Sequence, residues 1–264
     1  KVSMTTRLMA ENTRFFPFNK GIENPVNPNG HKSSYLWEDI LQPNNLLDLI
    51  DNFIHEHEVT DRVYDDKTQQ VKVEKNKILI FPRYHQLDVI RQIKSAVVNE
   101  GVGHNYLIQH TTGSGKSNSI AWLAHLLTHL FQSKDDKDRI FDSIIVVTDR
   151  RLLDRALKNI IKQMERVSGV VHPVDKTSAQ LRQFLSSGKD IIITTIQKFN
   201  VIAESMQQLK GNTFAVIIDE VHSSQSGESA KNLKMSLSQK IEEGIEEDAV
   251  DEVEDMDAKI LQQI

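Results

Sequence analysis

The stretch that decides the fold is His110-Thr111-Thr112-Gly113-Ser114-Gly115-Lys116-Ser117. It follows a short apolar run, Tyr106–Gln109, which we expect to be a strand, and it precedes an expected helix over Ser117–Phe131. A glycine-rich turn between a strand and a helix is the setting of a phosphate-binding loop. The glycines let backbone amides turn inward, and the helix N-terminus adds partial positive charge. The stretch therefore predicts a nucleotide-binding site.

Each residue type in this loop has an expected role. Lys116 would contact the β- and γ-phosphates, and the Ser117 hydroxyl would bind Mg²⁺. The strict pattern has glycine at position 110, where this chain has His110; helicase-type loops relax that glycine, so the departure favours this class. The remaining residues of the predicted nucleotide-binding loop are Thr112, Gly113, Ser114 and Gly115.

Apolar strands alternate with helices downstream of the loop. Strands are expected at Ile144–Thr148, Ile191–Thr194 and Phe214–Ile218, with a shorter one near Val170 and Val171. Helices are expected at Arg151–Met164, at Ser178–Leu185 and from about Gln197. This alternation indicates an α/β fold with a parallel sheet covered by helices on both faces. Ligands of such sheets bind at the carboxyl ends of the strands.

An acidic pair, Asp219-Glu220, follows the last of these strands. Asp219 would hold the hydration shell of Mg²⁺ opposite Ser117, and Glu220 would orient and deprotonate an attacking water. His222 would couple the state of the nucleotide to neighbouring segments. The plainer alternative is a solvated acidic pair, but the phosphate loop upstream favours the catalytic interpretation.

A glutamine upstream of the loop is the candidate for recognising the base. It closes the stretch Phe81-Pro82-Arg83-Tyr84-His85-Gln86. Because an amide presents both a donor and an acceptor, Gln86 would pair with adenine and select ATP over GTP. The alternative is an exposed glutamine at the start of the helix expected over Tyr84–Val98.

Two further strand ends carry residues suited to nucleic acid. One is Thr148-Asp149-Arg150-Arg151, in which Arg150 and Arg151 are candidate DNA contacts and Asp149 could cap the next helix. The other is Thr194-Thr195-Ile196-Gln197-Lys198, in which Thr194, Thr195 and Lys198 are the candidates. A cap and a solvated face are the alternative for each segment.

The composition is that of an ordinary globular chain of 264 residues. The absence of cysteine excludes disulfides, thiolate catalysis and cysteine-ligated zinc, and it fits a cytoplasmic location. No apolar run approaches the roughly 18 residues that a membrane span needs, and no secretory signal opens the chain. The net charge of −5 is uneven: residues 241–264 carry −9 and residues 1–240 carry +4. A mildly basic body permits phosphate contacts.

Three domains are expected: a linker or arm over 1–70, a lobe over 71–240, and an acidic insertion or tail over 241–264. Leu46–Ile54 has helical spacing, and Ile78–Phe81 is a short strand candidate. If His55-Glu56-His57 lies on a helix, its histidines are on different faces, so we discount a metal site. Asp61, Asp65 and Lys67 faintly resemble a nuclease carboxylate–lysine set, but Asp65-Asp66-Lys67-Thr68 is expected to be a turn, so we discount that site.

Several stretches together resemble the R (motor and restriction) subunit of type I restriction–modification enzymes, a member of helicase superfamily 2. They are Met4–Gly21, Phe81–Gln86, His110–Ser117, Val146–Arg155, Thr194–Phe199 and Asp219–Gln225. The resemblance implies a RecA-like sheet as the first, incomplete motor lobe, with ATP and Mg²⁺ as cofactors. It also implies translocation along duplex DNA, cleavage by an attached nuclease, and methylation and specificity subunits as partners.

The same resemblance indicates what this chain lacks. The nuclease residues and the second lobe are absent, so we expect a piece of a longer protein that binds ATP weakly and barely hydrolyses it. Two alternatives stay open. The chain could belong to another superfamily 2 DNA or RNA motor, or it could be a non-catalytic docking module with a vestigial nucleotide site.

Overall fold

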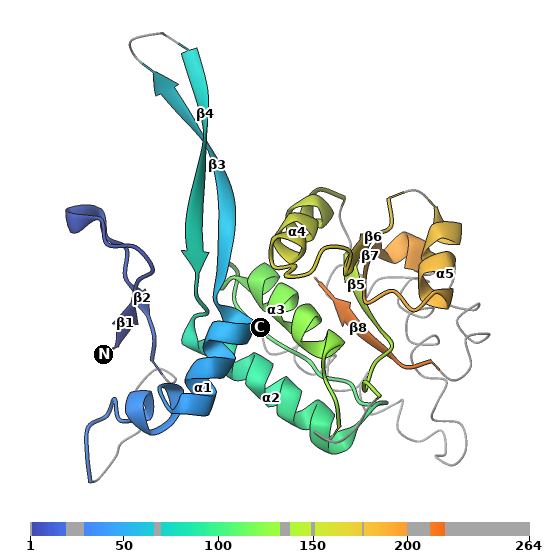
Figure 1. Ribbon diagram of the computed structural model, residues 1–264, viewed down its shortest axis with the longest axis horizontal. Coiled ribbons are helices and arrows are strands. Elements are labelled where there is room, and N and C mark those ends of the chain that lie inside the picture. The colour runs from blue at the N-terminus through green and yellow to red at the C-terminus, as the bar shows by residue number, and fades with distance from the viewer. Residues whose placement is uncertain are drawn as a thin grey trace, which may run out of the picture.

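Parallel strands form the sheet at the centre of the structure, in the order β6-β7-β5-β8 (Figure 1). The computed structural model describes residues 2–19, 29–65, 70–132, 138–148, 151–175, 177–199 and 212–219. The strands are β5 (Ser143–Thr148), β6 (Val171–Pro173), β7 (Ile191–Thr195) and β8 (Phe214–Ile218). All pairings within this sheet are parallel, so the predicted strands and their direction are confirmed.

Helices cover both faces of this sheet, as predicted. They are α2 (Tyr84–Glu100), α3 (Lys116–Thr128), α4 (Arg151–Gln163) and α5 (Ser178–Ser186). Ile144 and Val146 of β5 pack into the core that contains α2, α3 and α4. Ile145 and Val147 pack into a second core with Leu181 of α5. Because successive side chains of a strand point to opposite faces, a sheet covered on both sides requires the continuous apolar runs seen in the sequence.

The expected strand at Tyr106–Gln109 is wrong. This segment is not part of a strand, and Leu107 is 85% exposed. A cavity of about 270 Å³ is lined by residues of this segment and by Ile217 and Ile218 of β8. The segment therefore lies beside the edge of β8 without forming the backbone pairing that a strand needs.

The N-terminal arm packs on the same core as the helices of the lobe. It begins with β1 (Ser3–Met4), η1 (Ala10–Asn12) and β2 (Phe16–Pro17), in which β1 and β2 pair as a small ladder. The segments η2 (Leu36–Ile40), α1 (Pro43–Asp48) and η3 (Leu49–Phe53) follow. Phe18, Tyr35 and Phe53 are buried in the core shared with α2 and α3. The indole N–H of Trp122 in α3 donates to the carbonyl oxygen of Phe53 at 3.0 Å. The helix predicted over Leu46–Ile54 is thus confirmed as two consecutive helical segments.

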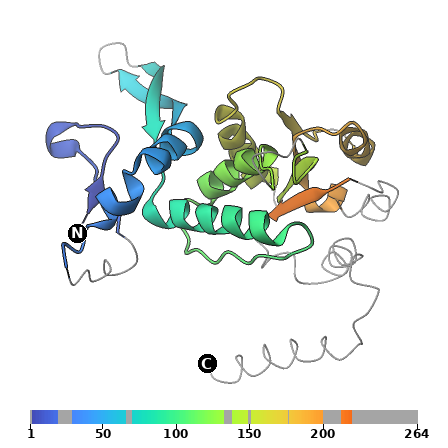
Figure 2. The same ribbon diagram turned by 60° about the horizontal axis from the view of Figure 1, so that its bottom comes forward.

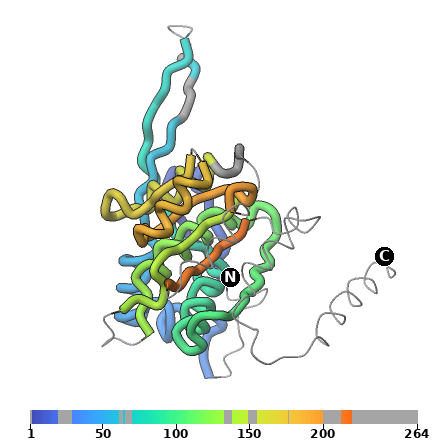
Figure 3. Tube along the Cα trace, turned by 90° about the vertical axis from the view of Figure 1, so that its right-hand side faces the viewer, coloured from blue at the N-terminus to red at the C-terminus, as the bar shows by residue number. Residues whose placement is uncertain are grey.

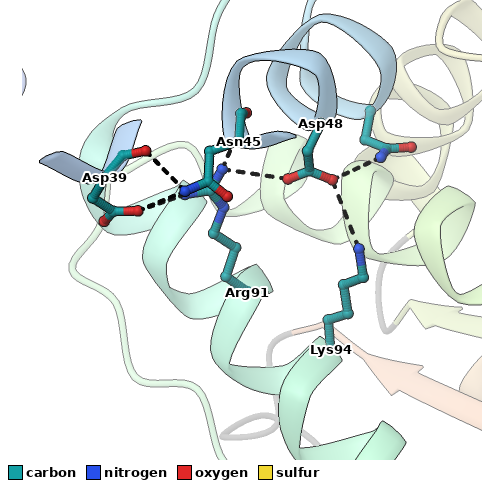
Figure 4. Close-up of polar contacts among 6 residues, drawn as sticks. Asp39, Asn45, Asp48, Arg91 and Lys94 are labelled. Atoms are coloured by element: carbon teal, nitrogen blue, oxygen red, sulfur yellow. Dashed lines mark hydrogen bonds and ion pairs between the residues drawn. The ribbon is translucent and has the colours of Figure 1, made fainter. Parts of the chain in front are cut away.

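Polar contacts also fasten the arm to α2 (Figure 4). Arg91 of α2 lies 3.4 Å from a carboxylate oxygen of Asp48 and donates to the carbonyl oxygen of Asn45 at 3.4 Å. Lys94, one turn further along α2, lies 3.7 Å from the other Asp48 oxygen, and Asp39 lies 4.0 Å from Arg91. Helix α2 runs from this arm towards β8, so it connects the arm with the sheet (Figure 2).

A long antiparallel hairpin projects from the body between the arm and α2 (Figures 1 and 3). Its strands are β3 (His55–Asp65) and β4 (Gln70–Ile80), paired along their whole length. His55-Glu56-His57 does not lie on a helix, because these residues belong to β3, as do Asp61 and Asp65. Asp65 ends β3, and the rest of the turn expected at Asp65–Thr68 is not among the described residues. Lys67 lies outside the described residues. The hairpin also runs across residue 70, where the expected arm would end.

The described residues include no helix that is long and apolar enough to cross a membrane. The expected acidic segment 241–264 lies outside them.

Candidate nucleotide-binding site

The loop before α3 has the backbone geometry that its glycines allow. Gly113 and Gly115 have φ angles of +78° and +86°, in the left-handed region that other residues rarely adopt. Gly115 is the N-cap of α3, and Lys116 is the first residue of the helix. A side chain at Gly115 would also collide with its surroundings, because a Cβ there would lie 2.6 Å from Nε2 of Gln86. The loop is thus in close contact with the segment that contains Gln86.

That upstream segment holds consecutive carbonyl groups of the loop. Arg83 Nη1 donates to the carbonyl oxygen of Gly113 at 3.4 Å, and Gln86 Nε2 donates to that of Gly115 at 2.8 Å. Between them, His85 Nε2 lies 3.1 Å from the carbonyl oxygen of Ser114. In a trans peptide the N–H points opposite to the carbonyl. Fixing the carbonyls of Ser114 and Gly115 therefore turns the N–H groups of Gly115 and Lys116 towards the other side, where a phosphate would lie.

Sequence reasoning missed this role of Arg83 and His85. In the sequence, Arg83 and His85 stand out only as members of the stretch Phe81–Gln86, for which base recognition by Gln86 is the one predicted role. The stretch Phe81–Gln86 and the loop His110–Ser117 are distant in the sequence, so nothing in the sequence indicates that their side chains and carbonyl groups are in contact.

Gln86 is only 3% exposed, so the alternative of a surface glutamine is wrong. Its Oε1 accepts from the backbone N–H of Arg83 at 2.9 Å, which caps the start of α2, while its Nε2 contacts the loop. An amide oxygen has two lone pairs and an amide nitrogen has two hydrogens. One of each is left for a base, so adenine recognition by Gln86 stays a prediction.

The structure brings the predicted lysine and the first carboxylate to one cavity. Lys116, Asp219 and His110 all line the cavity of about 270 Å³ beside β8. Asp219 is placed there because β8 ends at Ile218 and the Asp219 N–H donates to the carbonyl oxygen of Val147 at 3.0 Å. Ser117 follows Lys116 in α3 and is partly exposed. A hydroxyl and a carboxylate are oxygen ligands of the kind that Mg²⁺ prefers, so the chemistry of this donor set suits the ion. Ser117 does not line the cavity that Asp219 lines, and a Mg²⁺ site formed by the two residues stays a prediction.

His110, at the position of the relaxed glycine, packs against the upstream segment. Its ring meets the His85 ring edge to face, with centroids 5.0 Å apart. Its Nδ1 is buried and has no hydrogen-bond partner among the described residues. Burial, followed by electrostatic interaction with His85 and Lys116, lowers the pKa of His110 below its ordinary value. A neutral ring at this position adds no charge that would compete with Lys116.

The remaining predicted residues are placed less completely. Glu220, His222, Arg150 and Asp149 lie outside the described residues, and Arg151 is described only as the first residue of α4. Thr194 is 1% exposed, so a contact with DNA through its hydroxyl would require this segment to move. Thr195 is partly exposed, and the Lys198 amino group donates to the carbonyl oxygen of Val174. Groups of side chains able to hold a metal ion on their own are absent from the described part of the chain.

A comparison with protein families accounts for this combination of fold and loop. Residues 85–245 match the family described as SWI2/SNF2 ATPase, which is more than half of the chain. The chain belongs to the SWI2/SNF2 ATPase family. The match begins within the upstream segment that holds the loop and includes every strand of the parallel sheet. The RecA-like fold expected from the sequence is therefore confirmed.

Individual relatives show which kind of protein within this family the chain is similar to. The chain is 30% identical over 165 residues to a type I restriction enzyme endonuclease subunit of Staphylococcus aureus (strain MSSA476), which covers 61% of this chain and 16% of that protein. It is 28% identical over 161 residues to a subunit of the same description from Staphylococcus saprophyticus, covering 59% and 16%. These similarities confirm the resemblance to type I restriction subunits. The chain spans about a sixth of the length of these relatives.

Proposed function

We propose that this chain binds ATP with Mg²⁺ at the loop His110–Ser117, as part of the DNA-translocating and DNA-cleaving subunit of a type I restriction enzyme. The family match and the names of the relatives support this class of protein. The observation that carries nucleotide binding is the contact of Arg83, His85 and Gln86 with consecutive loop carbonyls. A glycine-rich turn without a binding role would not require three side chains to hold its carbonyl groups.

Each residue of the site has a role in this proposal that follows from its chemistry. Lys116 neutralises phosphate charge, and the backbone N–H groups of Gly115, Lys116 and Ser117 face the phosphates at the positive end of α3. Ser117 and Asp219 would hold Mg²⁺, which when bound stabilises negative charge on the phosphates. Glu220 would accept a proton from water. The second lone pair and the second N–H of the Gln86 amide select adenine.

DNA contact and assembly complete the proposal. Arg150 and Arg151 follow β5 in the sequence, Thr195 is the last residue of β7, and Lys198 follows that strand. These are the strand ends at which parallel sheets present their ligands. Thr194 would join them only after a movement that exposes it. The names of the relatives describe a subunit of a type I restriction enzyme, which supports further subunits as partners. That these are methylation and specificity subunits, in a cytoplasmic setting, is what the family resemblance implies. His222 would transmit the nucleotide state to these contacts.

The test is a titration of a fluorescent ATP analogue against the wild type, Lys116→Ala and Lys162→Ala. Lys162 is an exposed lysine in the last turn of α4, so its variant controls for loss of one charge. A charge-assisted contact is worth about 1.5–3 kcal/mol, so Lys116→Ala should weaken binding at least about tenfold, and Lys162→Ala should not. Equal binding by all three proteins would instead favour a docking module with a vestigial site.

Hydrolysis by the isolated chain should be negligible. Motors of this kind need arginines from a second lobe to stabilise the transition state, and this chain does not contain them. A phosphate-release assay that showed DNA-stimulated turnover by the 264-residue chain would contradict this expectation.

A further inference from the structure

A second cavity, of about 680 Å³, lies where the N-terminal arm meets the phosphate loop. Its lining includes Met4, Arg7, Arg14 and Phe16 of the arm together with Gln86 and Gly115. It therefore reaches the loop from the side of Gln86, whereas Lys116 and Asp219 line the other cavity. Its volume lies within the range of about 300–1,000 Å³ that is usual for small-molecule sites.

One wall of this cavity is a stacked pair contributed by two parts of the chain. The Arg83 guanidinium carbon lies 5.1 Å from the centre of the Phe16 ring. The same guanidinium donates to the carbonyl oxygen of Gly113 in the loop. A planar guanidinium packed on an aromatic ring and fastened at one edge is a preorganised surface for stacking.

The arm holds Phe16 in this position through the core. Phe18, two residues further on, is 3% exposed and meets the Tyr84 ring edge to face, with centroids 5.4 Å apart. The hydroxyl of Tyr35 donates to the carbonyl oxygen of Phe18. On the other side, Phe16 pairs with Met4 in the β1–β2 ladder. The cavity wall made by the arm is thus fixed by buried contacts and by backbone pairing.

The charges around this cavity favour an electron-rich, anionic ligand. Three arginines line it: Arg7, Arg14 and Arg83. The acidic side chain among the described lining residues, Glu56, is 2.6 Å from the amino group of Lys77. Nucleobases stack on arginine and aromatic side chains, and the phosphates that accompany them favour positive surroundings.

We propose that the arm completes the base-binding part of the nucleotide site. Arg83 is the stacking surface for adenine, Phe16 is the positioning residue that holds Arg83, and Arg7 and Arg14 line the same pocket. This inference rests on the proposed binding of ATP at the loop. Its consequence is that bound nucleotide adds to the contacts that hold the arm, so whatever precedes residue 2 in a longer protein would sense an occupied site.

The test separates binding of the base from binding of the phosphates. Displacement of a ribose-labelled fluorescent ATP analogue is measured with ATP and with inorganic tripolyphosphate, which has no base. Phe16→Ala should raise the Kd for ATP about two- to fivefold, the value of one cation–π contact, and leave the Kd for tripolyphosphate unchanged. Phe16→Trp should restore ATP binding. The matched control is Phe15→Ala, which removes a neighbouring ring that is 61% exposed and does not line the cavity.

A second measurement follows the arm itself. Arg7 and Arg14 are exposed trypsin sites, so ATP should slow cleavage at both more than tripolyphosphate does. An unchanged Kd for ATP in Phe16→Ala, or an equal loss for both ligands, would overturn the role of the arm. Failure of the wild type to bind either ligand would overturn the proposed function, and this inference with it. Thermal unfolding of each variant shows whether the arm is still folded.

Discussion

Replacing Gly115 by alanine tests the contact between the phosphate loop and Gln86. The substitution carries two costs. A non-glycine residue in the left-handed region costs about 1–2 kcal/mol, and Gly115 has a φ of +86°. The new Cβ would also lie 2.6 Å from Gln86 Nε2, so the Gln86 side chain must move.

Moving Gln86 breaks two hydrogen bonds at once. They run to the Arg83 N–H and to the Gly115 carbonyl oxygen, at 2.9 and 2.8 Å. Each is worth about 0.5–1.5 kcal/mol, so the displacement adds about 1–3 kcal/mol. The expected loss in the free energy of unfolding is therefore about 2–5 kcal/mol for Gly115→Ala.

Gly113→Ala is the matched control in the same loop. Gly113 has a φ of +78°, but a Cβ there would meet nothing within 4 Å. It should lose only the conformational part, about 1–2 kcal/mol. Urea unfolding measures both variants, with equal slopes confirming a comparable transition. In a double-mutant cycle, Gln86→Ala should bring the cost of Gly115→Ala down to that of Gly113→Ala. Equal destabilisation by both glycine variants in the wild-type background would refute the collision with Gln86.

Two further predictions concern stability away from the loop. Trp122→Phe removes the N–H that satisfies the buried carbonyl of Phe53, so the free energy of unfolding should fall by about 1–3 kcal/mol; an unchanged urea midpoint would contradict the bond. Burial lowers the pKa of His125 below its ordinary 6.5. The unfolded chain then takes up the proton first, so stability present above about pH 6.5 is lost as the pH falls. Urea unfolding at about pH 7.5 and about pH 5.5 should show this loss, and His125→Gln should reduce it.

The parallel sheet could be predicted from the sequence because a strand that is buried on both faces appears as a continuous run of apolar residues. The runs at Ile144–Thr148, Ile191–Thr194 and Phe214–Ile218 are almost wholly apolar, and each corresponds to a strand. Branched aliphatic residues in runs of this length have few alternatives to a covered strand. The apolar run Tyr106–Gln109 has the same appearance but no backbone partner, and composition alone does not supply one.

The sequence predicts only the base of the hairpin, as the strand candidate Ile78–Phe81, because the rest of the hairpin has no buried face along most of its length. Most of β4 is exposed, and polar and apolar residues alternate only over Gln70–Glu74, where Val71 and Val73 are themselves exposed. Cross-strand ion pairs replace that pattern, at 2.7 Å between Lys75 and Glu58 and 2.6 Å between Lys77 and Glu56. Such pairs join residues that are distant in sequence, and they form only once the register is known.

In the candidate site, too, the residues of the local motif could be predicted from the sequence, whereas the contacts made by distant segments could not. The motif gives the loop, Lys116 and Ser117 because their spacing is fixed by the turn into a helix. It does not give the support from Arg83 and His85, since that depends on how α2 packs beside α3. It also gives no sign of Phe16, which reaches the site only because Phe18 is anchored in the core.

Gln86 was predicted from the local motif, but its contact with the phosphate loop depends on how distant segments pack. A variant of Gln86 should therefore affect both proposed parts of the nucleotide site. Its amide caps α2 and also holds the carbonyl of Gly115, so the proposed base recognition and the proposed phosphate binding would both depend on this one side chain. Gln86→Ala should therefore raise the Kd for tripolyphosphate as well as for ATP, by about two- to tenfold for the loss of one supporting hydrogen bond. Phe16→Ala should affect ATP alone. If Gln86→Ala changed ATP binding and left tripolyphosphate unaffected, its contact with the loop would have no part in shaping the phosphate site, and Gln86 would act on the base only.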